Sequence, residues 1–247
     1  MEKESFLSLI IPAHNEEKRL PACIENLVKF IQSRPETIDV IIVENGSNDK
    51  TYSMAEKYQQ QYPWLQVLHE EKAGKGNAIR RGMLEAHGQF RMFADIDFAM
   101  PIEEVNKFIP PELQNFDVAI ASREIEGSIQ NNKAAIRNLS SHIFNMFVQL
   151  FVIKGLRDTQ CGFKCFTANA AEQIFKVQTI DGWAFDVELL YIARSYNFKI
   201  VEIPVTVNYD ETSKVKLWSA VPKMFMDLLK IPINGRKGLY DRTNQSK

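Results

Sequence analysis

The first half of the chain alternates short, β-rich apolar runs with segments of helical periodicity, and this alternation restricts the fold more than any other feature. Strands are expected over residues 6–11, 40–43, 67–69, 90–94 and 118–121. Helices are expected between them, over residues 17–32, 48–61 and 76–87. Repeated strand–helix–strand units are typical of a mainly parallel sheet with helices on both faces. The pattern therefore predicts an α/β protein with a Rossmann-like first half.

The second half changes to longer helices. They are expected over about 133–153 and 183–196, with a strand near 200–207. A last helix, about 217–231, has apolar side chains on one side and lysines elsewhere, so it can dock on the core or on anionic lipid, and the core is favoured. Residues 139–153 are apolar but interrupted by polar residues, which suits a core or membrane-surface helix rather than a span of roughly 20 residues.

Composition places the chain among ordinary globular proteins. It has 247 residues, of which 45% are hydrophobic, a formal net charge of -1 and three cysteines. A near-neutral chain without an arginine-rich arm or zinc-type Cys/His spacing is not expected to bind nucleic acid. Three cysteines are too few for a disulfide framework, so buried thiols in a reducing compartment are expected. The N-terminus has no charged-then-apolar leader, which favours a cytoplasmic location.

Two carboxylates close the apolar run 90–94. Asp95 and Asp97 follow it directly, and the carboxyl end of a strand in an open α/β sheet faces the crevice in which ligands bind. Two hard oxygen ligands there suit Mg²⁺ or Mn²⁺, whose remaining ligands are usually water and substrate phosphates. The pair is interpreted as a diphosphate clamp, and the alternative is a capping and turn pair.

Polar turns follow the first two strands. Residues 12–17 stand where α/β proteins commonly bind a nucleotide, although Asn15 could instead cap a helix. Glu44 is expected at the tip of the second strand, where it can accept hydrogen bonds from a base or ribose. Gly46 can take a turn conformation that other residues rarely adopt, and Ser47 or Asn48 can cap the next helix.

Together these segments resemble the inverting glycosyltransferases of family 2, which have the GT-A fold and use a nucleotide-diphosphate sugar. The resemblance continues through Gly74-Lys75-Gly76, Asp95-Ile96-Asp97 and two later segments, 158–164 and 183–190, over nearly the whole chain. The later segments look like the branch of dolichyl-phosphate β-glucosyltransferases, close to the polyprenyl-phosphate mannose synthases. The family commonly has two aspartates where this chain has Glu44 and Asn45.

The resemblance implies a single GT-A domain over 1–247, with a nucleotide-sugar half of about 1–125 and a helical, acceptor-side half of about 126–247. It implies a metal site at Asp95 and Asp97. The implied nucleotide-sugar pocket consists of Pro12, Ala13, Asn15, Glu16, Glu44, Gly46, Lys75 and Asp95. The implied acceptor-phosphate site consists of Arg123, Arg137 and Ser141, and the implied active-site loops carry Asp158, Gly162, Trp183 and Glu188.

Arg123 and Arg137 suit an acceptor-phosphate site chemically, because a guanidinium binds phosphate in a bidentate manner. The alternative interpretation of each arginine is a surface ion pair. Asp186 and Glu188 lie two positions apart on an expected helix, so they point in different directions and one of them is expected to face the donor sugar. Asp186 is chosen, and its alternative is charge stabilisation of a helix N-terminus. Asp186 and Asp97 are therefore the candidate catalytic residues.

The activity implied is inverting transfer of a hexose, glucose above all, from a UDP-sugar to a polyprenyl phosphate, with Mg²⁺ or Mn²⁺. The protein is then expected in the cytoplasm or at the cytoplasmic face of a membrane, with 139–153 and the last helix as membrane-facing elements. One alternative has a saccharide or protein hydroxyl as acceptor, and another is a non-catalytic nucleotide-sugar sensor. A sugar-1-phosphate nucleotidyltransferase is disfavoured, because residues 12–17 lack its glycine-rich, arginine-bearing loop.

Overall fold

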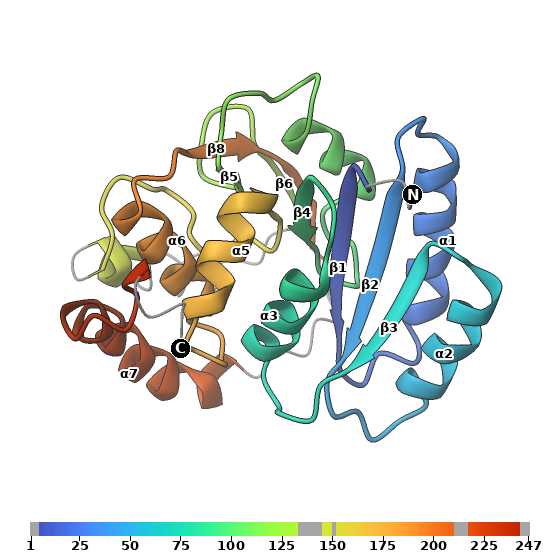
Figure 1. Ribbon diagram of the computed structural model, residues 1–247, viewed down its shortest axis with the longest axis horizontal. Helices are drawn as coiled ribbons and strands as arrows, with labels where there is room; N and C mark the ends of the chain where they lie inside the picture. The colour runs from blue at the N-terminus through green and yellow to red at the C-terminus, as the bar shows by residue number, and fades with distance from the viewer. Residues whose placement is uncertain (1–4, 133–144, 150–151, 210–216, 243–247) are drawn as a thin grey trace.

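A seven-stranded sheet runs through the molecule, with helices on both of its faces (Figure 1). The computed structural model describes residues 5–132, 145–149, 152–209 and 217–242. The strand order is β3-β2-β1-β4-β7-β5-β8, and a separate two-stranded sheet pairs β6 with β9. The strands are β1 (Leu7–Ala13), β2 (Ile38–Glu44), β3 (Leu65–His69), β4 (Phe90–Phe93), β5 (Val118–Ser122), β6 (Ile129–Asn131), β7 (Lys164–Thr167), β8 (Ile200–Pro204) and β9 (Thr206–Asn208).

The sheet is parallel except at β7. Strands β1, β2, β3 and β4 all run in the same direction. Strand β7 lies between β4 and β5 and runs antiparallel to both. Strands β4 and β5 therefore point the same way. As a result, the loops that follow β1, β2, β4 and β5 leave the sheet at one edge, which is where open α/β sheets bind ligands.

Helices cover both faces because both faces of the central strands are apolar. Along β1, Leu9 and Ile11 belong to one buried cluster and Ile10 to the other. The first cluster includes side chains of α1, and the second includes side chains of α3, α5 and α6. The helices are α1 (Leu20–Gln32), α2 (Thr51–Gln61), α3 (Lys75–Glu85), the 3₁₀ helix η1 (Ile102–Phe108), α5 (Ala168–Val177), α6 (Phe185–Ser195) and α7 (Leu217–Arg236). This double burial explains why the strands read as nearly continuous apolar runs.

Most of the expected elements of the first half are confirmed, with boundaries shifted by a few residues. The strand expected at 200–207 is divided at Val205 into β8 and β9, which belong to different sheets. Strand β7 and helix α5 were not predicted as separate elements. Of the helix expected at 133–153, residues 145–149 are described and are helical, whereas 133–144 lie outside the described residues.

The described part of the chain contains no helix that is both long and apolar enough to cross a membrane. The three cysteines are buried and free, as expected. Burial raises the pKa of the Cys161 thiol to about 12, with a further contribution from the Asp158 carboxylate. These thiols are therefore protonated at neutral pH.

The packing of α3 on the sheet generates a prediction. A Cβ atom at Gly82 would lie 2.5 Å from Cγ2 of Ile10 and 2.9 Å from Cγ2 of Val43. We expect Gly82→Ala to lower the free energy of unfolding by about 1–3 kcal/mol, because these core side chains have little room to move. Urea denaturation measures the change. Arg81→Ala, on the exposed side of α3, should stay within about 0.5 kcal/mol of the parent protein, and a stabilised Gly82→Ala variant would contradict the packing described.

Candidate functional site

The loop after β4 presents two accessible carboxylates. Ile96 is buried, while Asp97 is exposed and the Asp95 side chain is 37% exposed. Asp97 accepts a hydrogen bond from the Ala99 N–H at 3.1 Å, and the Phe98 N–H donates to the Asp95 carbonyl at 3.2 Å. The segment is thus a tight turn, and it still leaves carboxylate oxygens available to a ligand. Desolvation, followed by the Asp95 charge, raises the pKa of Asp97 above its ordinary value.

Lys75 reaches this loop from the start of α3. Its Nζ lies 2.5 Å from Oδ1 of Asp95 and 5.4 Å from the centre of the Trp183 ring. Burial lowers the pKa of Lys75, but the carboxylates of Asp95, Asp186 and Asp97 outweigh burial and raise it. Lys75 is therefore a cation held among three acidic side chains.

Two glycines make this position of Lys75 achievable. Gly74 has a φ of +139°, and a Cβ atom at Gly76 would lie 2.6 Å from the carbonyl oxygen of Ile180. The Gly76 N–H instead donates to the carbonyl of Asp181 at 2.9 Å. The sequence Gly-Lys-Gly therefore lets the backbone of the first half lie directly against a loop of the second half.

Asp186 lies in the first turn of α6 and binds a buried lysine. Nζ of Lys164 donates to Oδ1 of Asp186 at 2.6 Å and to the carbonyl of Cys161 at 2.8 Å. Burial raises the pKa of Asp186; Lys164 and Lys75 oppose this effect, and Asp95 adds to it, so that the pKa is raised overall. Lys164 was not among the residues predicted for the site. A lone lysine in the apolar run 163–166 was a signal for it, because lysine is rarely buried without a partner.

Glu188, two residues further along α6, has different neighbours. Its carboxylate accepts hydrogen bonds from the N–H and hydroxyl of Thr179, from the Ile180 N–H at 2.8 Å and from the Tyr240 hydroxyl at 2.7 Å. Asp186 is directed to Lys164, whereas Glu188 fixes the loop on which the Gly74–Gly76 segment rests. A direct role of Glu188 toward substrate stays a prediction.

The turns after β1 and β2 are hydrogen-bonded to each other. The Asn15 N–H donates to Oγ of Ser47 at 3.0 Å, and the Asn48 N–H donates to Oδ1 of Asn15 at 2.8 Å. The Glu16 N–H donates to Oγ1 of Thr51 at 2.8 Å. The helix-cap alternative for Asn15 is wrong, as is capping by Ser47 or Asn48: α1 begins after Arg19 and α2 after Lys50, and neither residue caps through its side chain. The two turns thus form one joined surface beside Pro12 and Ala13.

Glu44 is buried at the tip of β2, and its carboxylate is used within the protein. One oxygen accepts the Ser47 N–H and the other lies 2.6 Å from Nδ1 of His69. Gly46 has a φ of +62°, the turn conformation expected of it. Asn45 accepts the Gly74 N–H at 2.8 Å, which ties this turn to the Lys75 segment. Contact of Glu44 with a base or ribose stays a prediction, and Glu44 would first have to exchange one of these partners.

Glu16 lies within electrostatic reach of the Asp97 carboxylate. Burial raises the pKa of Glu16, the Arg19 guanidinium 3.1 Å away lowers it, and Asp97 raises it further. The loop after β1 and the loop after β4 therefore lie near each other, and their use as a nucleotide-sugar pocket stays a prediction.

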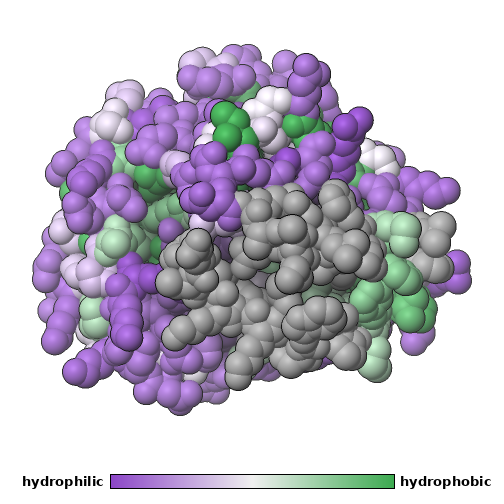
Figure 2. Space-filling view, turned by 180° about the vertical axis from the view of Figure 1, so that it is seen from behind, coloured by the Kyte–Doolittle hydropathy of each residue, from purple (hydrophilic) through white to green (hydrophobic). Residues whose placement is uncertain are grey.

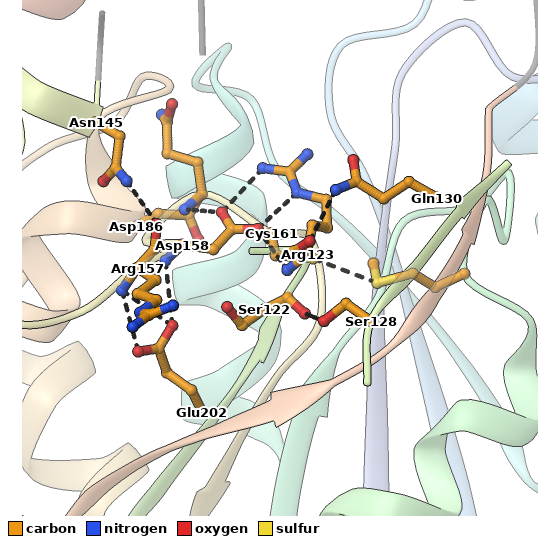
Figure 3. Close-up of polar contacts among 12 residues, drawn as sticks. Ser122, Arg123, Ser128, Gln130, Asn145, Arg157, Asp158, Cys161, Asp186 and Glu202 are labelled. Carbon is orange, nitrogen blue, oxygen red and sulfur yellow. Dashed lines mark hydrogen bonds and ion pairs between the residues drawn. The ribbon is translucent and has the colours of Figure 1, made fainter. Parts of the chain in front are cut away.

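Arg123 and Asp158 form a largely buried ion pair beside this space (Figure 3). Nε of Arg123 lies 2.6 Å from one oxygen of Asp158 and Nη2 lies 2.9 Å from the other, and the Arg123 N–H also donates to Asp158. Glu202 accepts the N–H groups of Arg157 and Asp158 and so fixes the loop. Arg123 is therefore engaged in an ion pair, with Asp158 buried and Arg123 24% exposed rather than open at the surface, and its role toward an acceptor phosphate stays a prediction.

Gly162 completes the floor of the site, because a side chain there would collide with the Asp95 carboxylate. The candidate site therefore gathers six residues around the Lys75 ammonium group and the loop after β4: Lys75, Asp95, Asp97, Gly162, Trp183 and Asp186. Arg137 and Ser141 lie outside the described residues. Their assignment to an acceptor phosphate stays a sequence-based prediction.

The carboxylates of this site suit a divalent cation. Asp95 and Asp97 are accessible hard oxygen donors, and the Asp95 charge adds to desolvation in raising the pKa of Asp97. Among the described residues no group of three or more His, Cys, Asp or Glu side chains could hold a metal. Two protein ligands nevertheless fit Mg²⁺ or Mn²⁺, because such ions commonly take the rest of their ligands from water and phosphates.

Comparison of the sequence with known proteins shows its family. A sequence model of the family described as glycosyl transferase family 2 matches residues 8–175. The chain is 31% identical over 249 residues to the dolichyl-phosphate beta-glucosyltransferase of Dictyostelium discoideum, with 95% of this chain and 76% of that protein covered. It is 36% identical over 250 residues to the human dolichyl-phosphate beta-glucosyltransferase, with 95% and 77% covered.

Comparison of the coordinates shows the fold. A crystal structure of glucosyl-3-phosphoglycerate synthase from Mycobacterium tuberculosis, in complex with Mn²⁺, UDP-glucose and phosphoglyceric acid, matches with a TM-score of 0.68. The match covers 92% of this chain and 79% of that chain, at 14% sequence identity. A second structure of that protein, with Mg²⁺ and UDP, gives a TM-score of 0.66 at 15% identity. The expected GT-A architecture is confirmed.

The Arg123–Asp158 pair generates a pH-dependent prediction. Burial raises the pKa of Asp158, but Arg123 outweighs burial and lowers it below its ordinary value. An aspartate with a lowered pKa stabilises the fold above its unfolded pKa of about 3.9, and this stabilisation is lost as the pH falls through the folded value. We expect Asp158→Asn to lower the free energy of unfolding at pH 7 by about 3–5 kcal/mol, because a buried guanidinium loses its partner.

Urea denaturation at pH 7 and at about pH 3 measures this difference in the free energy of unfolding. It should narrow at the lower pH, because Asp158 of the unfolded parent chain binds a proton below its ordinary pKa while folded Asp158, with its lowered pKa, resists protonation. Glu25→Gln is a control, because Glu25 pairs with Lys29 in the open and contributes little at either pH. A difference between parent and variant that is equal at the two pH values would contradict the ion pair.

Proposed function

This chain belongs to glycosyl transferase family 2, and we propose that it transfers glucose, with inversion, from UDP-glucose to a polyprenyl phosphate. The observation that carries the proposal is the meeting of Asp95, Asp97, Lys75 and Asp186 where the two halves of the chain face each other. The relatives named above are dolichyl-phosphate beta-glucosyltransferases over 95% of this chain, which supports glucose as the sugar and a lipid phosphate as the acceptor.

The donor side of the reaction needs stabilisation of a departing diphosphate. A Mg²⁺ or Mn²⁺ ion bound by Asp95 and Asp97 supplies positive charge to the leaving group. Lys75 adds a cation within 2.5 Å of Asp95, at a distance from which it can exchange this carboxylate for a phosphate oxygen. The joined turns after β1 and β2 form the wall on which the nucleoside would lie.

The acceptor side places different demands on Asp186. A phosphate monoester is largely ionised near neutral pH, because its second pKa is about 6, so it needs little help from a base. Asp186 would then act by its negative charge, stabilising the positive charge that develops on the sugar ring as the diphosphate leaves. A hydroxyl acceptor would instead require Asp186 to remove a proton.

The acceptor phosphate is expected to bind near Arg123, with Arg137 as its principal ligand. Arg123 already has two nitrogens on Asp158, so its charge is largely compensated within the protein. Arg137 lies outside the described residues, and its role rests on the sequence resemblance.

The proposal is tested with a panel of nucleotide-sugars and a short polyprenyl phosphate, with Mn²⁺ present, following nucleotide release and glycolipid together. We expect UDP-glucose to give UDP and an inverted glucosyl product. Asp97→Asn should lower kcat by about 10²–10³, the usual loss when one electrostatic contact to the leaving group is removed, and a chelator should abolish turnover. Arg137→Ala should cripple use of the lipid phosphate and leave UDP-glucose binding intact.

The same panel contains the contradicting outcomes. Product formation only on a saccharide or protein hydroxyl would show that the acceptor is a hydroxyl rather than a lipid phosphate. Unchanged activity of Arg137→Ala would contradict the assignment of Arg137 to a lipid-phosphate site. Donor binding with complete inertness toward every acceptor would make the protein a nucleotide-sugar sensor.

Peripheral contact with a membrane is part of the proposal, and α7 is the element that supports it. Met224, Leu228 and Ile231 of α7 are buried in the core, as favoured from the sequence. A second face of the helix exposes Met226, Leu229 and Ile233 by 64%, 55% and 46%. Figure 2 shows hydrophobic residues gathered at the side of the molecule where α7 lies. One helix thus packs on the protein and offers an apolar stripe to lipid.

We expect the chain to sediment with anionic vesicles of phosphatidylcholine and phosphatidylglycerol. Replacing Met226, Leu229 and Ile233 by serine should weaken partitioning at least about tenfold, because full burial of one such side chain contributes about 1.5–3 kcal/mol. Ile129→Ser is the matched control, since Ile129 is equally exposed but lies on β6. Equal recovery in the supernatant with and without vesicles would remove membrane contact from the proposal.

A further inference from the structure

Lys164 is fully buried, with 0% of its side chain exposed. Its Nζ binds Oδ1 of Asp186 and the carbonyl of Cys161, and lies 5.6 Å from the centre of the Phe93 ring. An apolar side chain could fill such a position, and exchange of a buried ion pair for apolar residues is often neutral or stabilising. Stability alone therefore does not explain a lysine here.

The position of Lys164 in the sheet explains how it reaches Asp186. Lys164 is the first residue of β7 and is in register with Phe93 of β4 and Ile120 of β5. It therefore extends from the middle of the sheet toward the first turn of α6. Phe93 comes two residues before Asp95, so the paired strands β4 and β7 carry both the loop with Asp95 and Asp97 and the buried lysine.

We propose that Lys164 is a positioning residue for Asp186, holding Oδ1 of this carboxylate so that Oδ2 is presented to the donor sugar. The inference rests on the proposed function, in which Asp186 faces the sugar. Among the described residues no group donates a hydrogen bond to Oδ2 of Asp186, so the ion pair leaves this oxygen available.

The charges around the pair support this role. The Asp186 carboxylate faces Lys164, Lys75 and Asp95, and the Lys164 ammonium also lies within electrostatic reach of Asp158. Burial raises the pKa of Asp186, and Lys164 is the largest opposing influence. Without Lys164, Asp186 would more readily bind a proton and would be free to turn within its pocket.

The test is a double-mutant cycle of Lys164→Met and Asp186→Asn, with kcat and KM for UDP-glucose measured for each variant and for the double variant. We expect Lys164→Met to lower kcat by at least about 30-fold while KM changes by less than about threefold. If Lys164 acts through Asp186, the double variant should have the kcat of Asp186→Asn alone, because residues that act as a unit give non-additive losses. Losses that multiply in the double variant would overturn the inference.

A folding defect is separated from this effect by two further measurements. The double variant carries no unpaired buried charge, so its thermal unfolding and its affinity for UDP should be close to those of the parent. Lys164→Gln keeps a hydrogen-bond donor without the charge, and it should retain more kcat than Lys164→Met. An equal kcat for Lys164→Met and the parent would overturn the inference while leaving the proposed function intact. A parent protein that turns over no nucleotide-sugar would overturn both.

Discussion

Contact between the Gly74–Gly76 segment and the backbone at Ile180 and Asp181 is the interaction on which the site depends. It brings α3 of the first half against the loop that precedes α6, and it allows no side chain on either glycine. Glu188 holds that loop through Thr179 and Ile180, with Tyr240 as a further partner. Lys75 reaches Asp95 because both surfaces are fixed. The acidic loop, the cation and Asp186 thus take their relative positions from backbone packing, and this explains why two glycines flank a lysine.

The charges of the site are arranged for a ligand that brings both signs. Asp95, Asp97 and Asp186 supply three carboxylates, and Lys75 and Lys164 supply two ammonium groups, which leaves one negative charge in excess. A divalent cation alone would reverse this sign, and a cation together with a diphosphate would restore it. Metal and donor are therefore expected to bind together more tightly than either does alone.

The local sequence pattern predicted most helices and strands of the first half and the place of Asp95 and Asp97 at the end of β4. The side-chain partners of individual residues could not be predicted from it. Apolar periodicity reports whether a segment is a strand or a helix, and the carboxyl end of β4 followed from that. Lys164 and Asp186 are 22 positions apart, and Glu188 and Tyr240 are 52 apart; such pairs depend on the tertiary fold. Strand β7 has only four residues and lies antiparallel in a mostly parallel sheet, so it gave no signal of its own. The contact of Glu44 with His69, on the neighbouring strand β3, is another such pair, 25 positions apart in the chain.

The position of α7 offers a physical route between a water-borne donor and a lipid-borne acceptor. Its buried face, with Met224 and Leu228, belongs to the same apolar cluster as Phe185 and Leu189 of α6. Asp186 lies in the first turn of α6. Because α7 packs on α6, only the width of α7 separates its exposed apolar stripe from the helix that carries the candidate catalytic carboxylate. A polyprenyl chain is too apolar to leave the bilayer, and only its phosphate needs to enter the site. A helix that rests on the core by one face and meets lipid by the other would place the membrane surface within reach of that phosphate.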